Sequence, residues 1–218
     1  MSLLPPVICV VTRARGVAGS PERRALVDRL VAAATAGAGM IQVRERQLSD
    51  RALVQFVREV IDRTRETPCQ LVVNDRADIA IAAGAAGVHL KEQSISAADV
   101  RTIAPAGFLV GRSVHSEEAA ASAEAEGACD YLLFGTVFPS SSKPDDHPIA
   151  GVEGLRRVCA RVSLPVLAIG GVNVSRARAV ARAGAAGAAA ISLFTDAHDI
   201  AETVTALRYA LTPQLRSV

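Results

Sequence analysis

The chain has 218 residues, with 24 Lys or Arg against 22 Asp or Glu and a formal net charge of +2. This near balance, together with an aromatic content of only 3%, argues against nucleic acid as a partner, because such proteins concentrate basic charge and stack bases on aromatic rings. An apolar content of 50% excludes intrinsic disorder and is enough for a large core.

Short runs rich in Val, Ile and Leu alternate along the chain with longer helical patterns. We predict strands buried on both faces at Val7–Thr12, Met40–Glu45, Gln70–Asp75, Gly87–Leu90, Phe108–Val114, Tyr131–Thr136, Pro165–Gly171 and Ala188–Phe194. A helix is expected after each strand, among them Pro21–Ala36, Ser49–Arg65, Ser175–Ala183 and Asp199–Leu211. Capping residues precede several helices (Ser20, Ser49, Ser116, Asn173), and glycines follow them (Gly37, Gly84, Gly127, Gly184).

Eight strand–helix units predict the α/β class and a single (β/α)8 barrel, also called a TIM barrel, over residues 1–218. The alternative is an open doubly wound sheet, but the glycine fingerprint of such folds does not follow the first strand. The N-terminal residues carry no basic leader, and no uncharged run reaches membrane length, so we expect a cytoplasmic protein with no membrane partner.

Polar residues gather where the predicted strands end, which is the face on which such barrels carry their active sites. Gln42, Arg44 and Arg46 alternate with period two, so all three are expected on one side of the second strand, suited to an anionic ligand. For Arg46 a solvated loop is an equal alternative. Asn74 and Asp75 close the third strand, where Asp75 is a candidate Mg²⁺ ligand, catalytic carboxylate or helix N-cap.

The glycine pair Gly170–Gly171 and Ser192 end the last two strands, the usual phosphate site of these barrels. The alternative for the glycines is a tight turn. The aperiodic segment 138–151 is long for a barrel loop, and its serines beside Lys143 suit a phosphate or diphosphate clamp.

Among the four histidines, His115 is the candidate acid–base group because it follows Ser113 by two residues on the fifth strand. His89 is expected to be a hydrogen-bonded core residue, and His147 and His198 to be solvated. No pair of histidines has the spacing of a zinc site.

Taken together, these stretches resemble the thiamine phosphate synthase/TenI family over nearly the whole barrel. The similarity lies in the order of motifs at successive strand ends: QVRER (Gln42–Arg46), VNDRADIA (Val73–Ala80), GVHL (Gly87–Leu90), GRSVHS (Gly111–Ser116), DYLLFG (Asp130–Gly135), FPSSSK (Phe138–Lys143) and AIGG (Ala168–Gly171).

The resemblance implies one of two reactions. Synthases of the family join hydroxymethylpyrimidine diphosphate to thiazole phosphate and hold Mg²⁺ with two aspartates, of which Asp75 matches the first and Ser94 stands at the second. Glu92, two residues before Ser94, is the alternative carboxylate. The last position of the Gln-x-Arg-x-Lys motif is Arg46 here. The remaining synthase-like positions are Gln42, Arg44, Asn74, Ser113, Ser140, Ser142, Lys143, Gly170, Gly171 and Ser192.

The loss of one carboxylate, and the QVRER and GRSVHS runs, favour the TenI-like branch, whose thiazole tautomerases move a proton without a metal or other cofactor. We therefore expect a tautomerase with His115 or Asp75 as proton carrier and Lys143 beside the substrate, although Thr136 stands where that branch has its histidine. The alternatives are a Mg²⁺-dependent synthase, a non-catalytic binding protein for thiazole or thiamine phosphate, and, more remotely, a Schiff-base aldolase using Lys91. The expected partners are a small phosphorylated thiazole and, in an oligomer, further copies of the chain.

Overall fold

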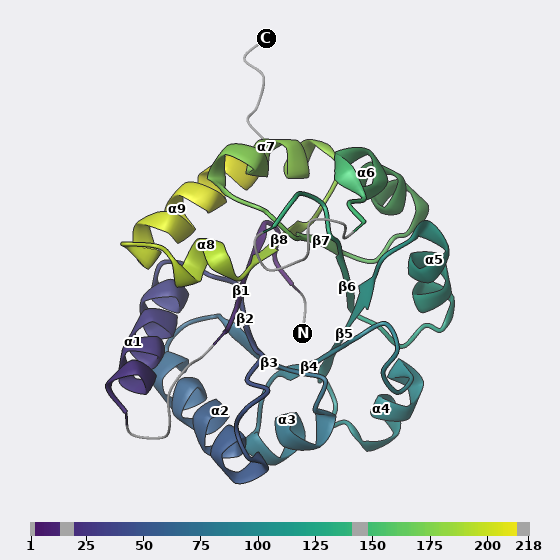
Figure 1. Cartoon of the computed structure of the whole chain (residues 1–218). Coiled ribbons are helices and arrows are strands. Elements are labelled where there is room, and N and C mark those ends of the chain that lie inside the picture. The colour runs from purple at the N-terminus through teal and green to yellow at the C-terminus, as the bar shows by residue number, and fades with distance from the viewer. Residues whose placement is uncertain (1–2, 14–19, 141–147, 213–218) are drawn as a thin grey trace.

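A computed structural model describes residues 3–13, 20–140 and 148–212, in which parallel strands close into a barrel inside a ring of helices (Figure 1). Each strand pairs with the next along the chain, and the last pairs with the first, so the predicted (β/α)8 barrel is confirmed. The strands are β1 (Val7–Val11), β2 (Met40–Val43), β3 (Gln70–Asn74), β4 (Gly87–Leu90), β5 (Leu109–Val114), β6 (Tyr131–Phe134), β7 (Val166–Ile169) and β8 (Gly187–Ala190).

The helices begin and end at the residues that local chemistry favours. Their bounds are α1 (Pro21–Thr35), α2 (Asp50–Thr64), α3 (Ala77–Ala83), α4 (Ala97–Ile103), α5 (Glu117–Ala125), α6 (Gly151–Arg161), α7 (Val174–Arg182), α8 (Ser192–Thr195) and α9 (Ile200–Leu211). Ser20, Ser49, Ser116 and Asn173 all accept a backbone N–H of the first helical turn, as expected of N-caps. Gly37, Gly84, Gly127 and Gly184 have positive φ after the helix ends.

The last predicted strand is too long. The ladder ends at Ala190, and the following residues form α8, a single turn whose N–H groups of Phe194 and Thr195 bond to the carbonyl of Ile191. A short apolar run fits a buried strand and a buried helical turn equally well, so its composition does not distinguish the two. Several other strands end one or two residues earlier than predicted, before their polar terminal residues.

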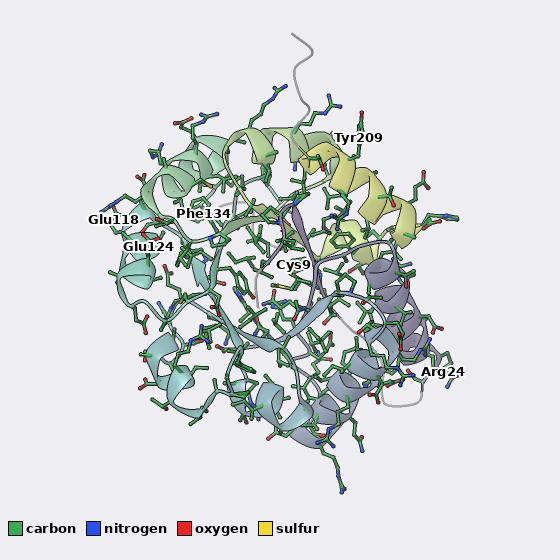
Figure 2. The ribbon with its side chains drawn as sticks, turned by 180° about the vertical axis from the view of Figure 1, so that it is seen from behind. Cys9, Arg24, Glu118, Glu124, Phe134 and Tyr209 are labelled. Carbon is green, nitrogen blue, oxygen red and sulfur yellow. The ribbon has the colours of Figure 1, made fainter. Side chains whose placement is uncertain are left out.

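Two apolar layers hold the barrel together. Along β1, Ile8 and Val10 pack outward against the helices, and the alternate residues face the barrel interior, as the period of a strand requires. The interior cluster consists of Val7, Cys9, Val11, Met40, Val72, Tyr131, Leu133, Leu167 and Ala189. Figure 2 shows the molecule from behind, with Cys9 inside the ring of strands. All four cysteines are free thiols, and burial raises the pKa of Cys69 to about 12.

Tyr131 is the largest side chain buried in the barrel, and it depends on a glycine opposite. A Cβ atom on Gly111 would lie 2.1 Å from the Tyr131 ring, so only glycine leaves room for that ring. The phenol in turn supports His89, whose ring centroid lies 5.6 Å from that of Tyr131. The packed interior thus supports the residues above it at the carboxyl ends of the strands.

At the other end of the barrel, Arg101 of α4 ties together the segments that lead into β5 and β6. Its guanidinium donates to the carbonyl of Ala128 at 2.9 Å and to the carboxylate of Asp130 at 2.6 Å, and also to the carbonyl of Phe108. This end therefore serves stability. Among the described residues, none of the helices combines the length and apolar character needed to cross a bilayer.

Candidate active site

A cavity of about 290 Å³ opens at the carboxyl ends of the strands, and every strand or the loop after it contributes to its wall. Of the residues predicted for the site, ten line this cavity: Gln42, Arg44, Arg46, Asn74, Ser113, His115, Ser140, Gly170, Gly171 and Ser192. Asp75 lies in an adjoining hollow. Ser142 and Lys143, together with His147, fall outside the described residues.

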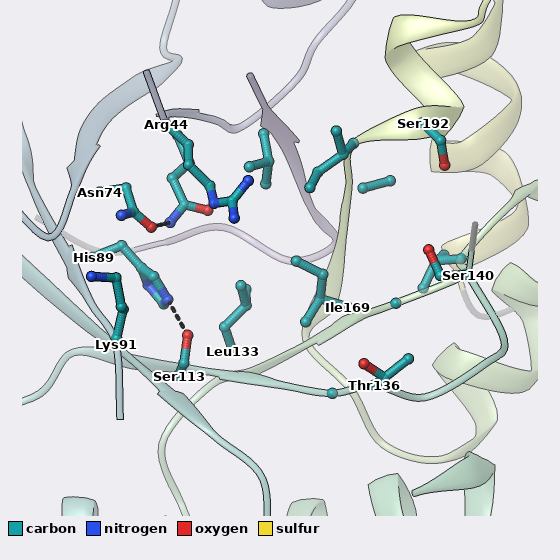
Figure 3. Close-up of a pocket in the computed structure, with 18 of the residues that line it drawn as sticks. Arg44, Asn74, His89, Lys91, Ser113, Leu133, Thr136, Ser140, Ile169 and Ser192 are labelled. Atoms are coloured by element: carbon teal, nitrogen blue, oxygen red, sulfur yellow. Dashed lines mark hydrogen bonds between the residues drawn. The ribbon is translucent and has the colours of Figure 1, made fainter. Parts of the chain in front are cut away.

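The cavity has two polar ends separated by an apolar floor (Figure 3). Arg44, Asn74, His89 and Lys91 lie at one end, and Leu133 and Ile169 form the floor between the ends. Ser140, Ser192 and Thr136 lie at the other end. This arrangement suits a ligand with an anionic group at each end and a ring between them.

The loop after β2 supplies the arginines of the first end. Gln42, Arg44 and Arg46 line the same cavity, as predicted, but β2 ends at Val43 and both arginines lie in the loop after it, so strand periodicity does not account for their position. Gln42 donates from Nε2 to the Oδ1 atom of Asn74 at 3.2 Å, which fixes both amides. Burial lowers the pKa of Arg44, and the charges of Arg46 and Arg13 act in the same direction, but a guanidinium stays charged at neutral pH.

His89 combines the predicted core position with a place in the cavity wall. Its side chain is 2% exposed, and its ring nitrogens lie 3.2 Å from the Tyr131 hydroxyl and 2.9 Å from the Ser113 hydroxyl. Burial lowers the pKa of His89 to about 4, against the opposing charge of Asp75, so the ring is neutral at pH 7. The sequence indicated the burial but not the cavity wall, although its spacing of two from Lys91 places both on one face.

Asp75 is fully engaged by residues that follow β4. One oxygen of its carboxylate accepts a hydrogen bond from the Lys91 ammonium, and the other accepts one from the Ser94 hydroxyl. Partial burial acts to raise the pKa of Asp75, but these hydrogen bonds and the Lys91 charge outweigh it and lower the pKa. The helix N-cap interpretation of Asp75 is wrong, because Arg76 occupies that position and Asp75, at a φ of 61°, directs its carboxylate to the β4 loop.

The side chains of Asp75 and Ser94 do not fit a Mg²⁺ site. Mg²⁺ requires a nearly octahedral set of oxygen ligands, usually anchored by one or two free carboxylates. Both oxygens of Asp75 are already hydrogen-bonded, one of them to a cation, and Ser94 provides no second carboxylate. Within the described ranges, no group of three or more His, Cys, Asp or Glu side chains is placed to hold a metal ion.

A histidine–carboxylate pair lies at the rim of the cavity. The Nδ1 atom of His115 is 2.9 Å from a carboxylate oxygen of Glu92, and both residues line the cavity. The two side chains are 52% and 37% exposed, so they remain accessible to a ligand. Ser113 and His115 share the cavity face, as their spacing predicts. The pairing of Glu92 with His115 was not predicted, since nothing in the sequence relates Glu92 to a histidine 23 positions away.

The second end of the cavity is built on the glycine pair. Gly170 and Gly171 have φ values of 96° and 60°, and a Cβ atom on Gly171 would lie 2.3 Å from the carbonyl oxygen of Pro139. The tight turn, which was the alternative interpretation of this glycine pair, is therefore present. The same glycines line the cavity with Ser140 and Ser192, so close approach of the chain and exposure of backbone to a ligand occur together.

Fold and cavity place the chain among the (β/α)8 barrels, whose active sites lie at the carboxyl ends of the strands. The profile of a family described as "Thiamine monophosphate synthase" matches residues 8–194. The chain belongs to the thiamine phosphate synthase/TenI family, which acts in thiamine biosynthesis.

Named relatives are synthases. The chain is 41% identical over 176 residues to a thiamine-phosphate synthase of Methanoculleus marisnigri, covering 81% of this chain and 83% of that protein. It is 38% identical over 199 residues to the thiamine-phosphate synthase of Chloroflexus aurantiacus, covering 91% and 89%. These relatives favour the synthase alternative over the expected TenI-like tautomerase.

Solved structures are consistent with the family assignment and with the barrel fold. A thiamine phosphate pyrophosphorylase from Pyrococcus furiosus superimposes with a TM-score of 0.81 at 34% identity, covering 94% of this chain and 95% of that one. A 3-hexulose-6-phosphate synthase gives a TM-score of 0.69 at 18% identity and shares the fold alone.

Proposed function

We propose that the protein is a thiamine-phosphate synthase, which joins hydroxymethylpyrimidine diphosphate to thiazole phosphate and releases diphosphate. The observation that carries the proposal is a cavity with anion-binding groups at both ends, in a chain whose 41% identical relative is named a synthase. Each substrate brings one aromatic ring and one phosphorylated group. The apolar floor accommodates the rings, and each polar end takes one of the anionic groups.

The reaction forms a bond between the thiazole nitrogen and the pyrimidine methylene carbon and breaks the bond from that carbon to the diphosphate oxygen. The leaving diphosphate takes the electron pair, so negative charge accumulates at that oxygen and is stabilised by fixed cations. Arg44 and Arg46 supply such cations at one end of the cavity. Gly170, Gly171 and Ser192 bind the thiazole phosphate at the other end through backbone N–H groups and a hydroxyl.

A paired turnover assay tests the proposal. One reaction contains the pyrimidine diphosphate and thiazole phosphate, with Mg²⁺ or with a chelator, and the other contains the unaromatised carboxythiazole phosphate alone. We expect thiamine phosphate in the first reaction and a loss of kcat/KM in Arg44→Gln. Arg63→Gln, which removes an exposed ion pair with Asp28, is the matched control and should behave as wild type. Absence of thiamine phosphate under every condition contradicts the proposal.

A tautomerase is the second candidate, and the His115–Glu92 pair favours it. A carboxylate that binds Nδ1 orients the imidazole and leaves Nε2 to take a proton from the substrate and return it, which aromatisation requires. In that case the second reaction yields product, and His115→Asn abolishes turnover while phosphate binding persists. Unchanged turnover in His115→Asn discards this candidate. Tight binding of thiazole phosphate, with no product formed in either reaction, identifies a binding protein.

The Schiff-base alternative receives no support from the site. A nucleophilic lysine must be neutral, whereas the Lys91 ammonium is held by the Asp75 carboxylate. We expect no covalent adduct on borohydride trapping with a carbonyl substrate.

A further inference from the structure

Lys91 stands out by both its type and its position. Only Lys91 and Lys143 among the 24 basic residues of the chain are lysines, so a lysine at the mouth of the barrel contrasts with the general use of arginine. Its ammonium contacts Asp75, the carboxylate that the family resemblance associates with a metal. A compact cation therefore already lies where the divalent cation was expected.

We propose that the Lys91 ammonium, held by Asp75, takes the place of the divalent cation and binds the diphosphate end of the substrate. This inference rests on the proposed synthase function, because it assigns the diphosphate to the end of the cavity that contains Lys91. It makes the binding of diphosphate independent of a metal ion.

The shape of the site places Lys91 where such an anion has to lie. Lys91 lines both the cavity and the adjoining hollow that contains Asp75, and it shares this double position with Arg44, Arg46 and Asn74. The hollow has a volume of about 520 Å³. Its charged lining residues are Arg44, Arg46, Arg76 and Lys91 against Glu45 and Asp75. Arg76 is paired with Asp50 and Asp78, so the positive charge that remains in excess comes from Arg44, Arg46 and Lys91. A group with several negative charges is the ligand that this balance favours.

The turn after β4 holds Lys91 and Ser94 in position. The backbone N–H of Lys91 donates to the Ser94 hydroxyl oxygen at 3.1 Å, and the N–H of Ser94 donates to the Lys91 carbonyl at 3.2 Å. Arg112 supports the same turn by donating to the carbonyls of Glu92 and Ser94 at 3.2 and 3.3 Å. The cation is thus fixed before a ligand arrives, which lowers the entropic cost of binding.

The Lys91 ammonium keeps hydrogen-bond donors for a ligand. A lysine has three N–H donors, of which the Asp75 oxygen takes one, so donors remain for phosphate oxygens in a side chain that is 52% exposed. Lysine is a common phosphate ligand that acts as a point charge. Ser94 satisfies the second oxygen of Asp75, where an aspartate at that position would repel the carboxylate unless a metal lay between them.

Inorganic pyrophosphate and Mn²⁺ are the probes for this proposal, each measured on the full chain without substrate turnover. Calorimetry in excess chelator should show pyrophosphate binding to wild type, with the affinity for the free anion unchanged when Mg²⁺ replaces the chelator. Lys91→Gln should weaken binding on the order of tenfold or more, the effect of losing one charge-assisted contact. Lys91→Arg should retain more of the affinity, and Arg63→Gln should match wild type.

Electron paramagnetic resonance of Mn²⁺ supplies the second readout. We expect no stoichiometric Mn²⁺ site in wild type and a gain of Mn²⁺ binding in the double variant Lys91→Gly with Ser94→Asp, which frees Asp75 and adds a second carboxylate. A wild-type Mn²⁺ site that Asp75→Asn abolishes overturns the proposal, as does pyrophosphate binding that requires Mg²⁺ or that Lys91→Gln leaves unchanged. Failure of the synthase function appears separately, as pyrophosphate binding without thiamine phosphate formation in the turnover assay.

Discussion

Neutral His89 in the wall of the cavity makes the stability of the protein depend on pH. Burial lowers the pKa of His89 from its ordinary value of 6.5 to about 4, so between these values the unfolded chain binds a proton that the folded protein does not. The free energy of unfolding therefore falls as the pH is lowered through this interval and is unaffected by His89 above it. At about 1.4 kcal/mol for each pH unit, the full interval corresponds to about 3 kcal/mol, of which about 2 kcal/mol is lost between pH 7 and pH 5.

Urea unfolding followed by circular dichroism measures this contribution when wild type is compared with His89→Gln at each pH from 5 to 8. Carboxylates titrate in both proteins and cancel in the difference. We expect the stability advantage of wild type over the variant to shrink by about 2 kcal/mol from pH 7 to pH 5. His198→Gln, at an exposed position, is the control and should run parallel to wild type. A difference between wild type and His89→Gln that stays constant with pH would refute the assignment of a buried neutral histidine.

Three further substitutions separate stability from function. Gly111→Ala places a Cβ atom 2.1 Å from the Tyr131 ring, and we expect a loss of about 1–3 kcal/mol in urea unfolding, typical of an overpacked core. Arg101→Ala removes the hydrogen bonds at the amino-terminal end of the barrel and should cost about 1–3 kcal/mol while kcat/KM of the folded enzyme stays unchanged; altered kinetics would mean that this end contributes to the site. Gly171→Ala directs a Cβ atom at the carbonyl of Pro139 and should raise KM for thiazole phosphate, and an unchanged KM would remove the glycine pair from the phosphate site.

Local chemistry was sufficient to predict the barrel. The N-caps at Ser20 and Asn173 and the alternation of apolar strands with amphipathic helices depend on residues close together in sequence, so they are visible before folding. The strand predicted at Ala188–Phe194 is wrong after Ala190, because local sequence does not determine the conformation there. Its apolar composition satisfies two conformations, and the choice between them depends on the helices that bury Phe194.

In the site, too, the features that depend on local spacing were predicted, and the contacts between distant residues were not. Gln42, Arg44 and Arg46 were predicted on one face from the period of a strand, and all three do line the cavity although β2 ends at Val43. The partners of Asp75 were not predicted, since Lys91 is 16 residues away and reaches the carboxylate only through the left-handed backbone of Asp75 and the turn after β4. Contacts made by two neighbouring strand ends depend on loop conformation, which spacing alone does not determine.

The packed barrel interior also constrains the order of events during turnover. Tyr131 and Leu167 fill the barrel beneath the cavity, so a ligand reaches the apolar floor through the mouth at the carboxyl ends. In the proposed synthase both reactants pass through this mouth, and the one whose ring lies deeper over Leu133 and Ile169 enters first. Initial rates should then follow an ordered sequential scheme, in which double-reciprocal plots intersect and the last product released competes with the first substrate bound.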